Sequence, residues 1–577
     1  MTFSRKLYRS IFFLVLASLL VIGSACSSGG GGSGSSSGGG GSSSSGSGAA
    51  GGNSGSNAAA DDGDPLGKYD PPITLTTINT DFGVNDKLAP GDTVEDNAWT
   101  RAYRDYLGIE VETLYSAASG GSAVDKLSLL IATDQMPDLF GTDTKTYEEL
   151  VKAGKLADIT DAYEKYASPA LKAVYEADGG RILNMAKRNG RLYGLPIGAG
   201  PTEDAHMLFV RKDWLDRLGL QAPETMDDVY KIAEAFTKND PDGNGIDDTY
   251  GLGTYKELFS WDASLTGFFN GFHAYPDHAR GLTWINQDGK MIPGYKMPEV
   301  RDALLKLQEL YKLGYMDPEW ATKGGDKLIE DVTQSKIGMY FGGVWDPDYR
   351  NLSLKKLDPN SDWLVLPIPS VDDKPAKAGV PDSYIYTLKV VNAKYAHPEA
   401  LIKAANLQLE LTKGPNADPV TYRTTEQIWK MPLVAPAIEP DNGYVATLTV
   451  KEAIETGDDS KLEPTAKIIY DRVMNWRNTG DPNDWGHERV FGPDNSTFMV
   501  VDYYVKNDLL QRNAFNGTET PAMRIYGNKL RDRAREVMTK VIMGEDIKAW
   551  DEFLEYWDKQ GGSDMEAEAT EWLNSQQ

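Results

Sequence analysis

The alternation of apolar and polar positions along the chain predicts strands and helices that follow one another. Segment 73–78 alternates and is rich in β-branched residues, which predicts a strand, and segment 110–114 predicts a second one. Apolar residues at helical spacing predict helices over 98–107 and 126–131, and the run 337–341 predicts a further strand. Strands that alternate with helices indicate α/β layering.

Later helices show clear start signals or amphipathic spacing. Thr225 and Asp228 form a capping box ahead of apolar positions at helical spacing. The same spacing predicts helices over 300–311, 530–542 and 547–557.

The start of the chain has the pattern of a targeting segment. Basic residues precede an apolar run over 11–22, and the small pair Ser24-Ala25 precedes the only cysteine, Cys26. The run is too short for a hydrocarbon core of about 30 Å but fits a signal h-region. We therefore predict a lipoprotein signal peptide over 1–25 with Cys26 as the lipidated residue. The alternative is an inefficient membrane anchor.

A Gly/Ser-rich segment follows the cysteine. Residues 27–57 are almost wholly Gly, Ser and Ala, which cannot bury apolar surface. We expect residues 26–64 to be a lipidated, flexible tether with a reach on the order of 30 Å. The expected location is the extracytoplasmic face of the cell membrane, with membrane contact through the lipid anchor only.

Composition narrows the choice of partners. The net charge is −26, and it becomes −29 once the three basic residues Arg5, Lys6 and Arg9 leave with the signal. Such a chain repels phosphate backbones, so nucleic acid is excluded as an expected partner. The roughly 510 residues after the tether are too many for one hydrophobic core, which predicts two lobes.

Six short segments occur in an order that is similar to one protein family. The chain resembles the extracellular solute-binding proteins (family 1 type) of bacterial carbohydrate ABC importers, in particular the large lipoproteins of Gram-positive bacteria. The matching segments are ATDQMPD at 132–138, GKLADIT at 154–160, LYGLP at 192–196, RKDWL at 211–215, KIGMY at 336–340 and IMGED at 542–546.

The resemblance implies an α/β, two-lobed periplasmic-binding-protein-like (type II) fold with hinge crossings near 196–204 and 381–388. Lobe 1 is expected to begin with 65–200 and lobe 2 with 201–380, while 381–577 is shared between both lobes and ends in helices. The implied function is capture of a carbohydrate, expected to be an oligosaccharide, and its delivery to an ABC permease. The protein is expected to be a monomer. The alternatives are a secreted polysaccharide-degrading enzyme and a binder of peptides or other small solutes.

Aromatic residues near predicted loops are candidates for sugar stacking. Trp345 follows a Gly-Gly turn after the strand 337–341, and by resemblance to the family an aromatic side chain at this place stacks on a sugar ring. Trp261 combines an indole with polar neighbours, and Trp485 resembles a loop anchor. Tyr384 lies at the second crossing. For Trp345, Trp261 and Tyr384 the alternative is ordinary packing.

Two acidic residues on loops of the first lobe are candidates for hydrogen bonds to sugar hydroxyls. Asp81 follows the first predicted strand, and Asp134 lies just before a Pro-Asp pair. Loops at the carboxyl ends of strands line the ligand crevice of open α/β sheets. The alternative reading of each carboxylate is a helix cap or a solvated acid.

The segment 240–251 resembles a calcium-binding loop. It places oxygen ligands at loop positions 1, 3, 5 and 9, a backbone carbonyl at 7 and a turn glycine, Gly245, at 6. Position 12 is Gly251 in place of the bidentate Glu, so a structural calcium ion needs another ligand there, and the alternative is a plain Asx-rich turn. The predicted ligands are Asp240, Asp242, Asn244, Ile246 and Asp248.

Catalytic motifs are weak or misplaced. Residues 34–38 match G-x-S-x-G but lie within the Gly/Ser-rich segment, away from any predicted strand. The five histidines lack H-E-x-x-H spacing, and no pair of acidic residues stands out. We therefore expect a binding protein rather than an enzyme.

Overall fold

The computed structural model describes most of the chain from residue 63 onward. Cys26, the Gly/Ser-rich segment and Asp81 lie outside the described residues. The described residues belong to one compact unit, Asp62–Gln577. They are 63–79, 88–116, 120–279, 281–382, 384–415, 417–424, 428–434, 442–517 and 519–576.

One hydrophobic core, which we call the core of the first lobe, combines residues 75–197 with 388–434. A three-stranded antiparallel sheet has the order β3-β16-β6, and β1 and β2 form a parallel pair. The elements of this lobe are β1 (Ile73–Asn79), α1 (Ala98–Ala102), β2 (Ile109–Ser116), α2 (Gly120–Ala132), β3 (Leu139–Thr142), α3 (Thr144–Lys152), α4 (Thr160–Tyr166), α5 (Pro169–Glu176), α6 (Arg181–Met185), β4 (Lys187–Arg188), β5 (Arg191–Leu192), β6 (Gly194–Ala199), β16 (Tyr384–Val391) and α13 (Ala400–Lys413).

A second core combines residues 205–380 with 473–569, and we call this part the second lobe. Its four-stranded sheet has the order β14-β7-β13-β8, in which β7 is antiparallel to both neighbours and β13 is parallel to β8. The strands are β7 (Met207–Arg211), β8 (Tyr250–Leu252), β13 (Ile337–Gly342) and β14 (Trp363–Leu366), with the short pairs β9 (Asp277–His278) and β10 (Gly281–Leu282), β11 (Trp284–Gln287) and β12 (Lys290–Pro293), and β15 (Ala378–Val380) and β17 (Leu510–Arg512).

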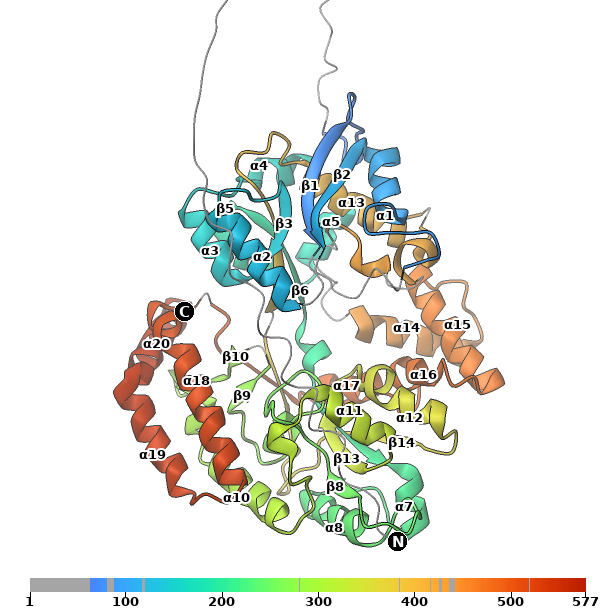
Figure 1. The fold of residues 1–577 in the computed structure, drawn as a ribbon, viewed down its shortest axis with the longest axis vertical. Coiled ribbons are helices and arrows are strands. Elements are labelled where there is room, and N and C mark those ends of the chain that lie inside the picture. The colour runs from blue at the N-terminus through green and yellow to red at the C-terminus, as the bar shows by residue number, and fades with distance from the viewer. Residues whose placement is uncertain are drawn as a thin grey trace, which may run out of the picture. The chain divides into compact units, whose positions relative to one another are not determined.

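Helices from distant parts of the sequence pack together in this lobe. Figure 1 shows α18, in red, beside α10, in yellow-green, and the two helices are in contact. The remaining helices are α7 (Lys212–Leu218), α8 (Met226–Lys238), α9 (Thr266–Gly271), α10 (Glu299–Lys312), α11 (Gly325–Thr333), α12 (Leu352–Leu357), α14 (Asn442–Thr456), α15 (Pro464–Thr479), α16 (Trp485–Phe491), α17 (Thr497–Lys506), α18 (Pro521–Ile542), α19 (Lys548–Trp557) and α20 (Ser563–Ser575).

Two connections between the cores lie side by side. The chain leaves the first core after residue 197 and returns after residue 380, and β6 pairs with β16 so that Ala199 lies opposite Tyr384. Between them, the buried Asp382 accepts hydrogen bonds from Arg181 of the first lobe (3.2 Å) and from Asn516 (2.8 Å). Asp382, on the second crossing, is therefore hydrogen-bonded both to the first lobe and to the segment near residue 516.

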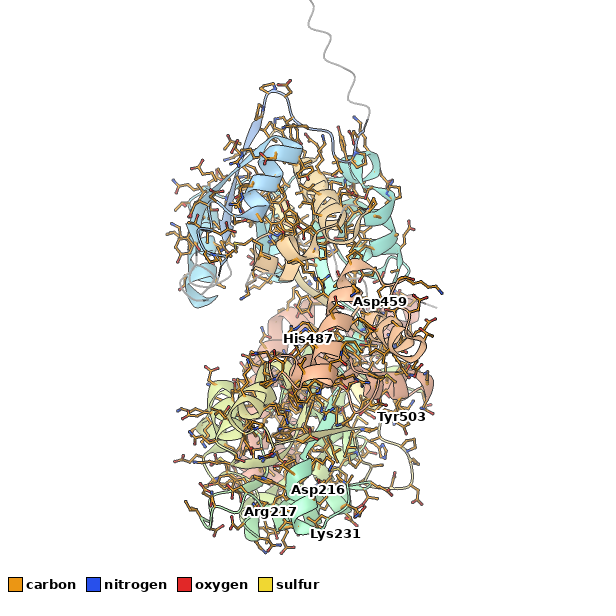
Figure 2. All side chains as sticks on the ribbon, turned by 90° about the vertical axis from the view of Figure 1, so that its right-hand side faces the viewer. Asp216, Arg217, Lys231, Asp459, His487 and Tyr503 are labelled. Carbon is orange, nitrogen blue, oxygen red and sulfur yellow. The ribbon has the colours of Figure 1, made fainter. Side chains whose placement is uncertain are left out.

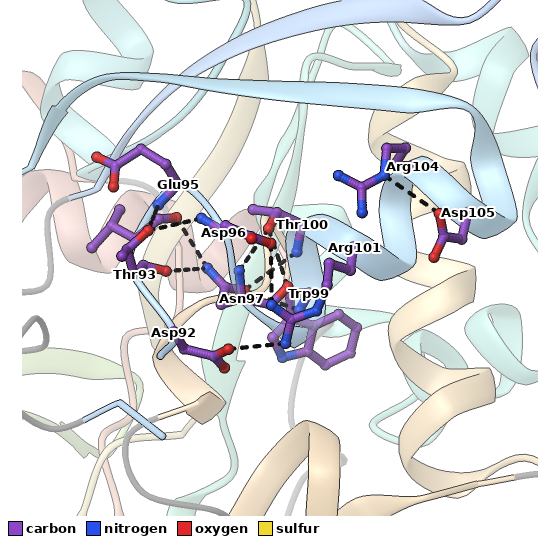
Figure 3. A network of polar contacts seen from close by, with 11 residues as sticks. Asp92, Thr93, Glu95, Asp96, Asn97, Trp99, Thr100, Arg101, Arg104 and Asp105 are labelled. Carbon is purple, nitrogen blue, oxygen red and sulfur yellow. Dashed lines mark hydrogen bonds and ion pairs between the residues drawn. The ribbon is translucent and has the colours of Figure 1, made fainter. Parts of the chain in front are cut away.

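The start of α1 illustrates how local sequence sets these elements. The Asn97 side chain accepts from the backbone N–H groups of Trp99 and Thr100, and the Thr100 hydroxyl accepts from the Asn97 N–H, which makes a capping box (Figure 3). Arg101 pairs with Asp92 (2.9 Å) and Asp96 (3.1 Å) in the same network. The helix predicted over 98–107 is observed as α1 followed by a π-helical turn, Tyr103–Leu107.

The other predicted elements have the expected type with shifted ends. The capping box of Thr225 and Asp228 is confirmed at the start of α8. α18 begins at Pro521, well before the predicted start at residue 530, because the Thr520 side chain caps a preceding turn that lacks a clean apolar period. In the part of the chain that the structure describes, no helix combines the length and the apolar character needed to cross a membrane.

Candidate functional site

A tight turn after β13 joins two segments that carry tryptophans. The turn begins with Gly342 and Gly343 and leads into Trp345. A Cβ added to Gly343 would lie 2.1 Å from the Trp261 carbonyl oxygen. Only glycine permits this approach, and it brings the backbones of the Trp261 and Trp345 segments together.

Trp345 is half-buried and held on several sides. Its Nε1 donates a hydrogen bond to Glu203 Oε2 (3.0 Å), on the short 3₁₀ helix Pro201–Asp204 of the first crossing. Its ring meets Phe491 and Phe498 edge-on, with centroid separations of 5.6 and 6.0 Å. The indole is therefore oriented by packing and by a carboxylate, which is the rigidity that a stacking platform needs.

Trp261 forms an aromatic pair with Tyr349. The two ring centroids lie 5.6 Å apart, Trp261 is half-buried, and Tyr349 is 53% exposed. Tyr349 lies on the π-helical turn Pro347–Asn351, directly after the Trp345 segment. Tyr349 is not among the candidates that the sequence suggested, although its position four residues after Trp345 in one helical turn was a usable signal.

The turn that carries Tyr349 is also tied to α16. His487 Nδ1 lies 3.0 Å from Asp348 Oδ2, and Arg472 donates to His487 Nε2 (2.7 Å). Because an arginine can only donate, Nε2 is the acceptor in this arrangement and Nδ1 faces the Asp348 carboxylate. His487 is labelled in Figure 2, on the ribbon of α16.

A buried ion cluster supports the tryptophan turns from within. Arg350 donates to Asp262 (2.6 Å) and, through Nε, to Asp346 (3.3 Å). Asp346 also accepts from the Gly343 N–H (2.9 Å), and the Tyr255 hydroxyl donates to Asp262 (2.7 Å). All three charged residues are buried, so the cluster joins the Trp261 and Trp345 segments inside the lobe.

Burial dominates the electrostatics of this cluster. It raises the pKa of the Asp346 carboxyl to about 7, while the Arg350 guanidinium opposes the rise. Arg350 faces two carboxylates, and among the described residues its Nη1 group has no hydrogen-bond partner. Removing one partner from such a cluster leaves an uncompensated buried charge, which costs about 3–5 kcal/mol.

The prediction of Trp485 as a ligand-binding residue is wrong. Trp485 begins α16 and has no exposed surface, since the helix turns it into the core of the second lobe. Trp485 therefore serves packing. Of Tyr384 the structure describes only the backbone, at the start of β16.

Asp134 lies at an exposed corner after α2. It has a positive φ of 56°, and its two oxygens accept from Lys155 (2.6 Å) and Lys394 (2.5 Å). Hydrogen bonds from these two lysines lower the pKa of the Asp134 carboxyl to about 2. The Asp134 carboxylate therefore forms ion pairs with two lysines. Among the described residues, no hydrogen bond or ion pair links it to Trp261 or Trp345.

The first lobe carries a small hollow at the ends of β1 and β2. Its volume is about 50 Å³, and Lys389 of β16 and Lys430 both line it, together with Thr77, Thr100 and Thr113. A larger cavity of about 550 Å³ lies on the second lobe around the segment 366–376, and neither Trp261 nor Trp345 lines it.

The oxygen-rich loop is compact and crowded with carboxylates. Asp240 accepts from the Gly245 N–H (3.1 Å), and the Asn244 amide donates to Asp242 (2.7 Å) and Asp248 (3.5 Å). Burial raises the pKa of Asp242, and the charges of Asp240 and Asp248 raise it further. Arg217, labelled in Figure 2, donates to the Pro241 carbonyl (3.3 Å).

The residue types of this loop suit a calcium ion, but the observed arrangement of their side chains does not. Asp240, Asp242 and Asp248 supply the carboxylates expected at positions 1, 3 and 9, and their mutual charge favours a cation. Across the described ranges, however, no three His, Cys, Asp or Glu side chains are gathered closely enough to hold a metal ion. The Asn244 amide nitrogen, bonded to Asp242, lies where a ligand oxygen is needed.

The chain belongs to the family of bacterial extracellular solute-binding proteins, whose pattern matches residues 85–407, more than half of its length. It is 24% identical to the polygalacturonan/rhamnogalacturonan-binding protein YtcQ of Bacillus subtilis (strain 168) over 65% of this chain and 69% of YtcQ. Lipoprotein LipO of the same organism is 29% identical over 44% of this chain and 48% of LipO. The fructooligosaccharide ABC transporter substrate-binding protein FusA of Streptococcus pneumoniae serotype 4 is 26% identical over 53% of this chain and 55% of FusA. The matches thus span from about half to about two thirds of these relatives.

Solved structures show the same fold. The S. pneumoniae FusA complex with kestose has a TM-score of 0.63 at 17% identity and covers 87% of this chain and 99% of FusA. The alginate-binding protein AlgQ2 without calcium ion has a TM-score of 0.59 at 16% identity and covers 89% of this chain and 100% of AlgQ2. The fold is therefore the α/β, two-lobed type II fold of periplasmic binding proteins, as predicted.

Proposed function

We propose that the protein is a lipid-anchored receptor that captures an oligosaccharide and delivers it to an ABC permease. The observation that carries this proposal is the pair of half-buried tryptophans, Trp345 and Trp261, placed on adjoining turns at the end of a central strand. An indole face suits the apolar C–H face of a sugar ring. Similarity to FusA and YtcQ, whose names state oligosaccharide or polysaccharide binding, supports the same ligand class.

The Trp345 site offers both stacking and hydrogen bonding. Glu203 lies beside the indole and Tyr349 beside Trp261, so aromatic faces and polar atoms occur together. Ligand sites of this kind are mostly apolar and have a few polar groups that fix orientation. We assign Trp345, Trp261 and Tyr349 to ligand contact, and we propose that hinge motion at the paired crossings closes the lobes.

The anchor, the oligomeric state and the absence of catalysis are parts of the same proposal. Lipidation at Cys26 would hold the protein at the extracytoplasmic face of the membrane, and similarity to lipoprotein LipO supports it. We propose a monomer that binds carbohydrate without cleaving it. A polysaccharide-degrading enzyme with the same tether would instead release shorter products during incubation.

Calorimetry on Trp345→Ala tests the receptor function. Truncating a stacked aromatic anchor costs at least about 2 kcal/mol in binding, roughly thirtyfold in affinity. Trp572→Ala serves as the control, because Trp572 is a half-buried tryptophan of α20 that packs on Phe515. Unchanged affinity of a folded Trp345→Ala protein for its oligosaccharide would remove Trp345 from the site. Chromatography of the recovered sugar separates binding from cleavage.

We also propose that calcium binds the loop 240–251 as a structural ion. One of the FusA structures is an EF-hand mutant, which supports calcium in a relative of this fold. Rotation of the Asn244 amide would turn its oxygen toward Asp242 and Asp248 and supply the ligand of position 5, in exchange for the hydrogen bond that this oxygen accepts from the Ile246 N–H (2.6 Å). Water would take the place of the absent carboxylate at position 12. Chelator should then lower the melting temperature, and Asp240→Ala should abolish this difference, whereas Asp227→Ala on the exposed start of α8 should keep it. Identical melting curves with and without calcium would contradict the proposal.

A further inference from the structure

Asp382, on the second crossing, accepts hydrogen bonds from side chains of both lobes. It follows β15 of the second lobe by two residues and precedes β16 of the first lobe. Its side chain is only 8% exposed, and two arginines and one asparagine donate to it. One carboxylate on the connection between the cores is therefore bonded to side chains that belong to different lobes.

The partner from the first lobe is Arg181, at the start of α6. Its Nη1 lies 3.2 Å from one oxygen of Asp382 and 3.3 Å from the other. The Arg181 Nε donates to the Asp178 carbonyl (2.9 Å), and the Arg181 N–H donates to the Asp178 carboxylate (2.9 Å). Gly179 and Gly180, with φ of 74° and 78°, form a turn that side chains with a Cβ rarely allow. The turn before α6 thus orients Arg181 toward the crossing.

The partners from the second lobe are Arg512, at the end of β17, and Asn516, which follows it. Arg512 Nη1 lies 3.4 Å from Asp382 Oδ1, and Asn516 Nδ2 lies 2.8 Å from Asp382 Oδ2. β17 pairs in parallel with β15. Between the two partners, the Ala514 N–H donates to the carbonyl of Trp284 (2.9 Å), a buried residue of the second core. The segment that carries Arg512 and Asn516 is therefore fastened to the second lobe.

The Asp382 carboxylate holds together two cations that repel each other. The side chains of Arg181 and Arg512 are 48% and 47% exposed, and both approach Asp382 Oδ1. Without the negative charge between them, the two guanidinium groups would separate, because like charges at short range repel. Among the described residues, Arg181 is the one side chain of the first lobe bonded to Asp382, whereas the second lobe supplies two. The contact between the lobes therefore depends on Arg181 more than on Arg512.

Such a contact restrains how the lobes turn relative to each other. Hinge motion occurs at a few residues that absorb changes in φ and ψ, here those of the paired crossings. The crossings join the lobes along one line, so rotation about that line is limited by side-chain contacts beside it. A ligand that touches both lobes has to order them, and a protein whose lobes are already aligned loses less entropy on binding.

We propose that Asp382 is a positioning residue for oligosaccharide binding: its carboxylate, shared by Arg181 and Arg512, narrows the range of lobe orientations and so raises the affinity for ligands that bridge the lobes. This inference rests on the proposed function, in which hinge motion closes the lobes. Asp382 acts through the orientation of the lobes and touches no ligand, so its loss changes the affinity for every sugar by the same factor. A residue that contacts the ligand would instead discriminate between sugars.

Distances between spin labels test this restraint without any sugar. The labels are coupled to a ketone-bearing amino acid at positions 145 of α3 and 231 of α8, which are exposed and lie in different lobes, so that Cys26 is left untouched. Arg181→Met should broaden the distribution of label distances in the full mature protein. The matched control is Arg191→Met, because Arg191 is 46% exposed but pairs with Asp158 inside the first lobe. This control should leave the distribution unchanged.

Calorimetry then measures the effect on affinity. Kestose, nystose and the di- and trisaccharides of galacturonate are titrated into each variant. Arg181→Met should weaken every sugar that binds by the same factor, about threefold to fivefold, which is the most that a half-exposed ion pair is worth. Asp382→Asn should weaken binding at least as much. Arg512→Met should cost less than about twofold, because Asn516 keeps its hydrogen bond, and Arg191→Met should cost nothing.

An unchanged distance distribution in Arg181→Met, or the same broadening in Arg191→Met, would overturn the inference and leave the receptor function standing. Losses of affinity that differ between the sugars would overturn it too. Tighter binding in Arg181→Met would do the same, because the contact would then oppose the bound arrangement of the lobes. If none of these sugars binds the wild-type protein, the proposed function loses its support, and the label distances alone decide for or against the role of Asp382.

Discussion

The two lobes present different chemistry at the ends of their strands. The second lobe has half-buried tryptophans on turns that rest on a buried ion cluster, whereas the first lobe has a small hollow lined by two lysines and by threonines. Aromatic rings offer an apolar face, whereas lysines and threonines offer hydrogen-bond donors. Both regions lie near the ends of strands, yet one is built from aromatic rings and the other from polar and basic side chains, so the same place in an α/β sheet can carry different chemistry.

The same contrast appears in one carboxylate from each lobe. Asp346 of the second lobe is buried, and burial raises its pKa to about 7. Asp134 of the first lobe is exposed between Lys155 and Lys394, and hydrogen bonds from these lysines lower its pKa to about 2. Desolvation determines the direction of the pKa shift of Asp346, and hydrogen bonds from lysines determine that of Asp134.

The largest expected effect comes from breaking the ion cluster of the second lobe. Arg350→Met should lower the free energy of unfolding by about 3–5 kcal/mol, because Asp262 and Asp346 would lose their buried counter-charge. Chemical denaturation measures this loss. Arg101→Met, which removes ion pairs of a 40% exposed side chain on the first lobe, should cost no more than about 1 kcal/mol. Equal losses in the two variants would show that the cluster has no special role.

A smaller effect should follow from crowding the turn beneath the tryptophans. Gly343→Ala places a Cβ 2.1 Å from the Trp261 carbonyl, which must move, and overpacking of this kind costs about 1–3 kcal/mol. Oligosaccharide affinity should fall as well, because Trp261 and Trp345 would shift relative to each other. Gly324→Ala is the control, since open space surrounds its added Cβ and its φ is −85°. Full affinity in a folded Gly343→Ala protein would argue against a shared Trp261–Trp345 surface.

The pH dependence of stability should reveal the buried acid. The pKa of Asp346 is about 7 in the folded state and 3.8 ordinarily, so between these values the folded state keeps a proton that the unfolded state has released. Its contribution to stability is therefore full below pH 3.8 and is lost as the pH rises toward 7. Asp346→Asn should remove this downward slope from a plot of unfolding free energy against pH. An unchanged slope would mean that Asp346 is already ionised in the folded protein.

The smallest effect is expected at the exposed acid of the first lobe. The pKa of Asp134 is lowered from 3.8 to about 2, so its contribution is present above pH 3.8 and is lost as the pH falls toward 2. Asp134→Asn should change stability only slightly at neutral pH, because its side chain is 45% exposed and solvent screens both lysine pairs. Oligosaccharide affinity should stay at the wild-type value, and a clear loss would return Asp134 to the ligand site.

Much of the fold could be predicted because its signals are local. The alternation in 73–78 and the capping box of Thr225 and Asp228 depend on residues within one or two turns of each other, and both are observed as β1 and α8. The Gly-Gly turn before Trp345 is local as well, so the indole could be named in advance. Trp485 was misread, because a tryptophan in a Gly/Asp-rich segment has the same sequence whether it faces solvent or the core.

The element types, the α/β class, the family and the aromatic residue after β13 are all readable from the order of the residues alone. Which side chains come into contact depends on the folded chain. Arg350 meets Asp262 from 88 residues away, and the hollow joins Thr77, Lys389 and Lys430 from three distant segments. The physical reason is that periodicity and capping act within a helix or strand, whereas burial and the pairing of charges depend on which elements the folded chain packs together.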